Sequence, residues 1–421
     1  MTRRWFALAV TMALLPGVTH AQKVQLVPPD GDGGKSWPRW RGPAQGVVAD
    51  GDYPDQWSPT ENVVWKVKVP GQGNSSPIIW KDRLFLTAHE NQGKKRLVLC
   101  FDRADGKLLW QCPVPEHLVE KAQGKNGYAS GTPSTDGERV YAYFGTGGLF
   151  CCDVDGKQVW HVPFPKMDAL HGMACSPLLF KDKVIIFQEH NPGGFIAAYD
   201  KLTGKELWRT PRKETVSWGS PIAIRVGGKE QIIVSSSMRV YGYDPDNGKE
   251  IWSCAGNLFE VIPTPVVGHD LLFCSSGRSG PTLAIRPEGA QGDITKTNVV
   301  WKTIKGSPFV PSPLLYGDYL YTVNDMLSIV SCFDARTGKQ FWQERCGQPV
   351  SEGFSASPIG VNGKVFFTND EGETYVMQHG DQFNLLHVNR LGEKTLASPA
   401  LIDGRWHIRT QKHLWCIGKA R

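Results

Sequence analysis

Residues that could take part in chemistry gather in the segments that lead into a series of repeats. They are an imidazole, two carboxylates and two aromatic rings, namely His171, Glu260, Glu352, Tyr128 and Trp218. An aromatic ring can stack on a flat ligand, while imidazole and carboxylate groups can make polar contacts or exchange protons. The same side chains could instead simply line a water-filled funnel. Under either interpretation, we expect these five residues to be the candidates for an axial pocket.

Common sequence signatures of catalysis are absent. The chain has no His-Glu-x-x-His, no Gly-x-Ser-x-Gly and no Cys-x-x-Cys-His, which would indicate a zinc peptidase, a serine hydrolase and a haem attachment site. The sequence therefore assigns no catalytic residue and no metal ligand. It favours binding over catalysis.

The segments that position these residues share a hairpin pattern, which is clearest from Ala198 to Trp208. Asp200 can accept hydrogen bonds from turn amides, Gly204 can adopt a positive φ, and Trp208 can fill a seam between sheets. A hairpin that recurs along the chain indicates a repeat protein. The pattern recurs at Asp102 and Trp110, Asp153 and Trp160, Asp244 and Trp252, and Asp334 and Trp342.

Each repeat opens with Ser-Pro or Thr-Pro, and these dipeptides set the period. Eight such starts, followed by short runs of β-branched and aromatic residues, predict an all-β fold, an eight-bladed β-propeller of four-stranded antiparallel blades. The last repeat lacks a fourth strand. We expect the N-terminal strand around Trp65 to complete the last blade and close the ring, because closure removes exposed sheet edges. The prolines that mark the starts are Pro77, Pro133, Pro177, Pro221, Pro265, Pro313, Pro358 and Pro399.

The chain is predicted to have three parts. Residues 1–21 combine Arg3 and Arg4 with a short apolar run and small residues, as in a cleaved signal peptide. Residues 22–61 are an N-terminal extension that docks on the propeller, which spans 62–421. No later segment reaches the roughly 18 apolar residues of a transmembrane anchor, and no cysteine precedes Cys100 that could carry a lipid. We therefore expect a periplasmic or secreted protein.

The charge of the chain bears on the class of its partners, and the positions of its cysteines bear on core packing. The formal charge is +6 and no basic block is present, which argues against nucleic acid as a partner. A monomer with a protein or small-molecule ligand at one propeller face is expected instead. Four of the ten cysteines, Cys100, Cys151, Cys332 and Cys416, occupy the slot that Ala198 fills in its repeat, so we interpret them as small packing residues. Disulfide pairing stays open.

Propeller topology predicts which face carries the site. With strands A to D running from the axis to the rim, the D–A loops share one face with the B–C turns, and the Asp-to-Gly turns lie on the opposite face. The turn face is stereotyped, whereas the D–A face varies and carries acids, imidazoles and aromatic rings. We expect any ligand site there, near the axis.

The Ala-x-Asp-x-x-x-Gly-x-x-x-Trp pattern resembles the tryptophan-docking motif of quinoprotein alcohol dehydrogenase-like (PQQ-like) propellers, over about residues 62–417. The segment from Trp37 to Pro43 resembles the N-terminus of secreted, planctomycete-type PQQ-repeat proteins. The resemblance implies either an enzyme that binds PQQ with calcium, or a periplasmic scaffold like the outer-membrane assembly factor BamB, or an exported propeller without known chemistry.

Among these, we expect a non-catalytic binding or scaffold protein. A compact PQQ-dependent dehydrogenase that oxidises an alcohol or sugar is the first alternative, and a carbohydrate- or cell-wall-binding propeller is the second.

Overall fold

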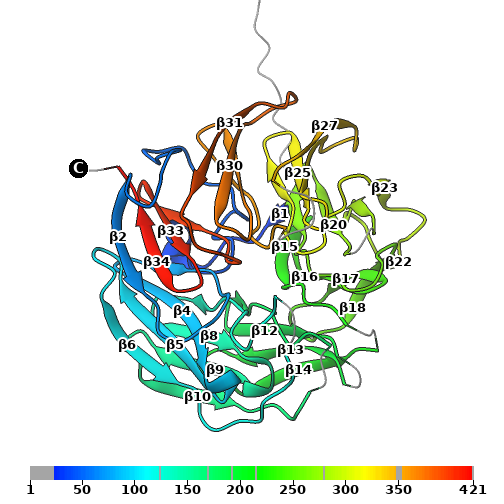
Figure 1. Cartoon of the computed structure of the whole chain (residues 1–421). Coiled ribbons are helices and arrows are strands. Elements are labelled where there is room, and N and C mark those ends of the chain that lie inside the picture. Colours follow the sequence, from blue (N-terminus) through cyan, green and yellow to red (C-terminus); the bar gives the residue numbers. More distant parts are fainter. Residues whose placement is uncertain are drawn as a thin grey trace, which may run out of the picture.

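Eight sheets surround a central axis in the computed structural model (Figure 1). The structure describes residues 23–122, 125–167, 170–190, 193–213, 216–277, 280–347 and 353–419. The predicted signal peptide lies outside these ranges. The described residues form strands and three short 3-10 helices, η1 (Gly31–Lys35), η2 (Asn91–Gly93) and η3 (Gly145–Gly147), without an α-helix. The predicted eight-bladed, all-β propeller is therefore confirmed.

The first four blades follow one another along the chain, each with strands A to D in order. Blade 1 is β3 (Ile78–Trp80), β4 (Arg83–Glu90), β5 (Lys95–Asp102) and β6 (Leu108–Pro113). Blade 2 is β7 (Ser134–Thr135), β8 (Arg139–Tyr143), β9 (Leu149–Asp153) and β10 (Gln158–Val162). Blade 3 is β11 (Leu178–Phe180), β12 (Lys183–Gln188), β13 (Phe195–Asp200) and β14 (Glu206–Pro211). Blade 4 is β15 (Ile222–Val226), β16 (Lys229–Ser235), β17 (Arg239–Tyr243) and β18 (Glu250–Ala255).

The remaining blades have the same order, except that the last is completed from the N-terminus. Blade 5 is β19 (Val266–Gly268), β20 (Leu271–Ser275), β21 (Thr282–Ile285) and β23 (Val299–Thr303). Blade 6 is β24 (Leu314–Tyr316), β25 (Tyr319–Asn324), β26 (Ile329–Asp334) and β27 (Gln340–Arg345). Blade 7 is β28 (Ile359–Val361), β29 (Lys364–Thr368), β30 (Glu373–Gln378) and β31 (Leu385–Arg390). Blade 8 is β32 (Ala400–Ile402), β33 (Arg405–Arg409), β34 (His413–Ile417) and β2 (Val63–Lys68).

Burial along the strands explains why the sequence forms these blades. Strands B and C lie between two neighbouring blades, so both of their faces are covered; β12 is buried at every residue. Apart from β18, the outermost strands have one partner only, and in β14 the buried Trp208 lies between exposed Leu207 and Arg209. Continuous apolar runs and alternating runs are the two patterns that such positions require.

The N-terminal strand closes the ring as predicted. β2 pairs antiparallel with β34, from Val63 opposite Ile417 to Lys68 opposite His413. The side chain of Trp65 is buried in the cluster that joins blades 7, 8 and 1. β2 therefore covers the edge that β34 would otherwise expose to solvent.

The recurring turn seats the tryptophan of the preceding blade. Oδ1 of Asp200 accepts hydrogen bonds from the amides of Leu202 (3.1 Å) and Thr203 (2.8 Å). Gly204 has a φ of 73°, and a Cβ at this residue would lie 2.8 Å from the ring of Trp160 in blade 2. Only glycine combines this backbone conformation with such a close contact.

The docked indoles also donate hydrogen bonds to the neighbouring blade. The acceptor is the carbonyl oxygen of the residue after the turn aspartate, at 3.0–3.1 Å, in the pairs Trp65 to Arg103, Trp110 to Val154, Trp160 to Lys201, Trp208 to Pro245 and Trp301 to Ala335. Trp342 donates to Gly380 at 3.2 Å. These bonds tie each of these blades to its neighbour with the same geometry.

Trp252 is an exception, because blade 5 lacks the short turn on which it would dock. Its indole N–H donates to Oε1 of Gln231 in its own blade, at 2.8 Å. The segment 286–301 replaces the turn, and within it β22 (Gly292–Asp293) pairs parallel with β18. The ring of Trp252 is still buried, in a cluster that includes Ile294 of this segment.

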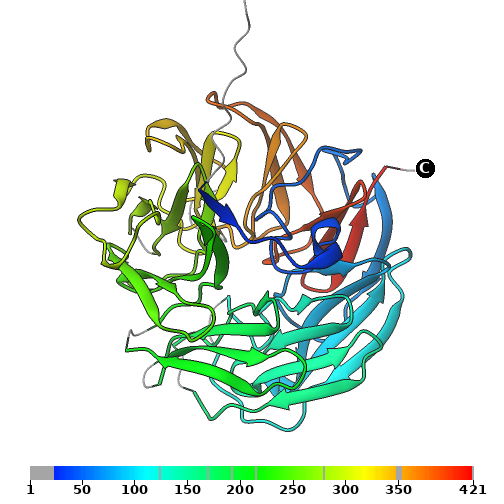
Figure 2. The same cartoon turned by 180° about the vertical axis from the view of Figure 1, so that it is seen from behind.

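The N-terminal segment 23–57, which we call the strap, crosses the axis on the face opposite the D–A loops (Figure 2). It starts with β1 (Val24–Leu26), which pairs with β15 of blade 4. Trp37 then bridges to Ile79 of blade 1, and the amide of Val48 donates to Gly360 of blade 7. Trp57 packs against Phe366 and Trp406, 6.2 and 5.1 Å between ring centroids. The strap thus connects blades that are far apart around the ring.

All ten cysteines are buried and carry free thiols in the structure. Cys151 and Cys152 lie within β9, each packed in a core cluster. Among the described residues, the helices are too short to cross a bilayer.

Candidate functional site

An axial cavity of about 380 Å³ opens among the D–A loops. Each of the eight loops contributes at least one residue to its wall, so the cavity is a product of the closed ring rather than of any one blade. In blade order, the loop residues are Asn74; Lys125, Asn126 and Ser130; His171 and Ala174; Trp218; Ile262; Phe309 and Val310; Ser355; and Leu396.

A ring of hydroxyl groups surrounds the axis at the base of this cavity. It consists of the Ser or Thr that precedes proline at the start of each blade. The backbone amide of each member donates to the hydroxyl oxygen of the next, at 2.9–3.1 Å, around the complete circle of Ser76, Thr132, Ser176, Ser220, Thr264, Ser312, Ser357 and Ser398. A hydroxyl that accepts one hydrogen bond can still donate another. The ring therefore offers donors to the axis.

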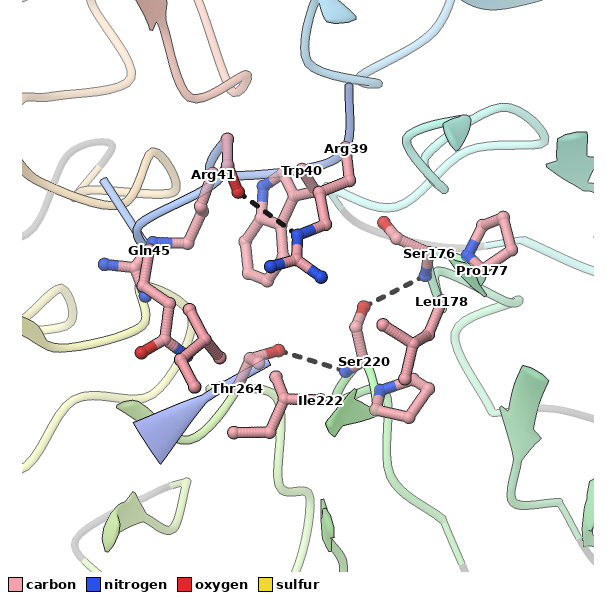
Figure 3. Close-up of a pocket in the computed structure, with 13 residues that line it drawn as sticks. Arg39, Trp40, Arg41, Gln45, Ser176, Pro177, Leu178, Ser220, Ile222 and Thr264 are labelled. Atoms are coloured by element: carbon pink, nitrogen blue, oxygen red, sulfur yellow. Dashed lines mark hydrogen bonds between the residues drawn. The ribbon is translucent and has the colours of Figure 1, made fainter. Parts of the chain in front are cut away.

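Trp40 of the strap lines the cavity from the side of the hydroxyl ring (Figure 3). Residues on both sides of Trp40 are held by the propeller: the carbonyl oxygen of Pro38 accepts from the amide of Thr135 at 2.8 Å, and Nη2 of Arg41 donates to the carbonyl oxygen of Pro313 at 2.7 Å. Blades 2 and 6 thus fix the strap on both sides of Trp40, whose ring forms the floor of the cavity.

Two of the five predicted site residues line the cavity. His171 and Trp218 come from neighbouring loops, and their ring centroids are 5.7 Å apart at an interplanar angle of 40°. The indole N–H of Trp218 donates to the carbonyl oxygen of Gly172 at 2.7 Å. Trp218 is only 7% exposed. Its ring is therefore part of the wall, with its polar group already bonded.

The other three predicted residues have different positions. Tyr128 packs edge-on against His89, 5.1 Å between centroids, with the guanidinium of Arg96 5.6 Å from its ring. Glu260 has a φ of 58° and turns its loop against Gly277, where a Cβ would lie 2.2 Å from the Glu260 carbonyl oxygen. Glu352 lies outside the described residues. The proposed role of these three in an axial site stays a prediction.

Two buried carboxylates beside the cavity come from B–C turns of the predicted face but were not among the five candidates. Asp370 is fully buried, pairs with Lys125 and accepts from the hydroxyl of Ser355 at 3.0 Å. Asp325 accepts from the amides of Phe309 and Val310, at 3.0 and 3.2 Å.

Burial is the main influence on both acids, and it raises the pKa of Asp325 and that of Asp370. Both carboxylates hold loops of the cavity wall in place. The sequence signal was the Asn-Asp pair that recurs at 324–325 and 369–370 in the B–C turns.

The described residues do not match the donor set of a quinone with calcium. Calcium takes about six to eight oxygen ligands, normally including carboxylates, whereas the cavity wall contributes hydroxyls, amides, a lysine and an imidazole. In the part of the chain that the structure describes, no group of three His, Cys, Asp or Glu residues could hold a metal ion. The described wall is suited to neutral hydrogen-bonding and apolar groups.

Comparisons with known proteins agree with this fold. A protein-family model described as outer membrane protein assembly factor BamB matches residues 94–344. BamB from Shewanella oneidensis is 23% identical over 306 residues, which cover 71% of this chain and 63% of that relative. The chain thus spans less than two thirds of the length of this relative.

Two solved structures show the same propeller. BamB from Moraxella catarrhalis superposes with a TM-score of 0.63 at 14% identity, over 85% of this chain and 97% of the other. Quinohemoprotein alcohol dehydrogenase from Comamonas testosteroni gives 0.64 at 13% identity, over 92% and 81%. At these identities the two structures establish the fold alone.

Proposed function

Because the chain belongs to the family of the outer membrane protein assembly factor BamB, we propose that it is an exported, non-catalytic scaffold. Its partner is a protein that docks on the face formed by the D–A loops and B–C turns. The scaffold acts in the assembly of outer-membrane proteins, the role that the names of its relatives carry. The protein is proposed to reside in the periplasm, as a monomer.

A group of exposed apolar side chains on the D–A face carries this proposal. It contains Phe259 and Ile304, which are 61% and 74% exposed. Contiguous exposed apolar patches mark interaction sites, and we infer such a patch from the loops that carry these side chains. The members are Leu118, Leu170, Met238, Leu258, Phe259, Ile304, Met326 and Leu327, of which the last six belong to blades 4 to 6.

The B–C turn and the D–A loop of blade 4 are joined directly. The amide of Met238 donates to the carbonyl oxygen of Leu258 at 3.1 Å, and the amide of Gly256 donates back to Met238 at 3.1 Å. These backbone bonds hold Met238 and Leu258 next to each other, so the B–C turn and the D–A loop carry their two apolar side chains as one rigid unit. A surface that is organised before binding loses less conformational freedom when the partner docks.

A small-molecule ligand in the axial cavity is a second candidate on the same face. The volume of about 380 Å³ falls within the range of roughly 300–1,000 Å³ that is typical of ligand pockets. The dehydrogenase alternative gains no support from the described wall, which has no carboxylate for calcium. The carbohydrate alternative relied on Trp218 as a stacking platform, and that ring is mostly buried with its N–H bonded.

Deletion of the gene and complementation in the native host test the scaffold function. Loss of the protein should lower the amount of assembled outer-membrane protein, and the wild-type gene should restore it. Phe259→Asp combined with Ile304→Asp should fail to restore it, because two charges would be placed in the interface. Leu207→Asp, on the exposed rim of blade 3, is the matched control and should complement.

Two results would contradict the scaffold function. One is an unchanged outer membrane after deletion, and the other is full complementation by the double variant. Circular dichroism of the purified variants would show that each one is folded.

A further inference from the structure

We propose that Cys112 and Cys152 form a disulfide bond that joins blade 1 to blade 2. Cys112 lies in β6, the outermost strand of blade 1, and Cys152 lies in β9, the C strand of blade 2. Both side chains are buried, at 3% and 0% exposure, in the cluster that fills the seam between the two blades. The inference goes beyond the proposed scaffold function, because it concerns how the ring is held together.

The docked tryptophan of blade 1 fixes how these two strands face each other. The indole N–H of Trp110 donates to the carbonyl oxygen of Val154 at 3.0 Å. The strands run in opposite directions, because β6 is antiparallel to the C strand of its own blade and all C strands run the same way along the axis. Cys112 follows Trp110 by two residues, and Cys152 precedes Val154 by two. Two residues advance a strand by about 6.6 Å, so both cysteines lie at the same level of the seam.

The same two places in the other blades with this indole bond hold a small side chain and a large ring. The pairs are Val67 with Phe101, Val162 with Tyr199, Thr210 with Tyr243, and Thr303 with Phe333. The members of the first pair share a core cluster, and so do those of the second, as facing residues should. Among these five seams, cysteine occupies both places only between blades 1 and 2. Because a thiol replaces the large ring there, the two sulfur atoms have room to meet.

The two thiols interact directly in the reduced protein. A hydrogen bond from the thiol of Cys152 lowers the pKa of Cys112, and the same bond, together with burial, raises the pKa of Cys152. The neighbouring thiol of Cys151 does not compete for Cys112. Successive side chains of a strand point to opposite faces, and Cys151 is packed in the cluster on the blade 3 side of β9. Cys152 is therefore the partner that the seam offers to Cys112.

Formation of the bond is a two-electron oxidation by a small disulfide, RSSR. The thiolate of Cys112 attacks RSSR and releases one RS⁻, and the thiolate of Cys152 then attacks the Cys112 sulfur and releases the second. The two cysteines lose two protons and two electrons, and RSSR becomes two RSH. Because both side chains are buried in the folded protein, the exchange takes place during folding, before the two blades pack together. Disulfides of this kind persist in oxidising compartments such as the periplasm.

Peptide mapping of the full chain tests the bond. The protein is refolded from urea with oxidised and reduced glutathione, or with dithiothreitol instead, and is then alkylated and digested with trypsin without reduction. We expect peptide 108–121 linked to peptide 140–157 in the glutathione sample alone. Cys152→Ser should lose this link, whereas Cys151→Ser, the matched control in the same peptide, should keep it. The test supplies its own oxidant, so its outcome does not depend on where the protein resides.

Thermal melts measure whether the bond holds the two blades together. Cys112 and Cys152 are 40 positions apart, and a cross-link over such a loop should raise the Tm of the oxidised wild-type protein by roughly 5 °C over that of the reduced protein. Cys112→Ser should have the same Tm after both treatments. Oxidised wild-type protein without the linked peptides, a link that Cys152→Ser retains, or equal Tm values of the oxidised and reduced wild-type protein would each overturn the proposal.

Discussion

The backbone amide of Ser398 donates a hydrogen bond of 3.0 Å to the hydroxyl oxygen of Ser76, although the two residues are 322 positions apart in the sequence. This bond is the last of eight equivalent bonds around the axis. The first and last A strands are thereby joined with the same geometry as any neighbouring pair. The ring is closed twice, at the axis by Ser398 and Ser76 and at the rim by β2 on β34.

Ser76→Ala should destabilise the propeller by about 1–3 kcal/mol, because it leaves the buried amide of Ser398 without an acceptor. Ser76→Thr should be close to neutral, since Thr132 and Thr264 fill the same place in other blades. Urea unfolding followed by tryptophan fluorescence measures both. Equal stability of the Ala and Thr variants would show that the hydroxyl contributes nothing.

Removal of residues 22–69 should expose the edge of β34 and strongly reduce solubility or Tm. The deletion removes both β2 and the strap, including the contacts of Trp57 with Phe366 and Trp406. An open sheet edge is a template for aggregation. Light scattering measures the aggregation of the truncated chain, and a thermal melt measures its Tm. A truncated chain as stable as the full chain would refute closure by β2 as a stabilising feature.

Gly156→Ala should cost roughly 3 kcal/mol or more, because a Cβ would add a steric clash to a left-handed backbone. Gly156 has a φ of 88°, and its Cβ would lie 2.6 Å from the ring of Trp110. Gly289 is the matched control: its φ is 70°, but a Cβ there meets nothing within 4 Å. Gly289→Ala should cost only about 1 kcal/mol. Similar losses in the two variants would mean that the tryptophan contact is unimportant.

His407 should make the protein sensitive to acid. Burial lowers the pKa of His407 to about 3 from 6.5, and the side chain is fully buried. Below pH 6.5 the unfolded chain binds a proton that the folded chain excludes, so stability falls as the pH falls toward 3. The loss should be about 2 kcal/mol at pH 5.

His407→Phe should flatten this acid dependence, because phenylalanine cannot titrate. The ring lies 5.9 Å from that of Trp65, so an aromatic replacement keeps the contact at the closure of the ring. Unfolding midpoints between pH 7.5 and 4 measure the effect. His161→Phe, at a half-buried histidine in β10, is the control. An unchanged slope in His407→Phe would assign the acid sensitivity to other groups.

The fold was predictable from sequence because each repeat carries its own packing information. Asp200, Gly204 and Trp160 interact through a turn whose residue types are fixed by backbone conformation and ring size. The same pattern in several repeats specifies the relation of neighbouring blades. Trp65 could be assigned to the last blade for the same reason, since it is the tryptophan that lacks a repeat of its own.

The candidate site was less predictable, because its geometry depends on contacts between distant segments. Sequence reasoning placed His171 and Trp218 at the axis, and both line the cavity. Tyr128 is in an equivalent loop, but Gly93 leaves room for its ring, where it packs against His89. The pairing of Lys125 with Asp370 joins the loop into blade 2 with a turn of blade 7, and no local pattern records such a contact.

Trp40 has a consequence for how anything could pass along the axis. Because the strap crosses the axis and holds the Trp40 ring at the base of the axial cavity, the protein resembles a cup with one mouth rather than an open tube. A molecule that enters among the D–A loops must leave by the same mouth, and no extended chain can be threaded from one side to the other while the strap stays in place.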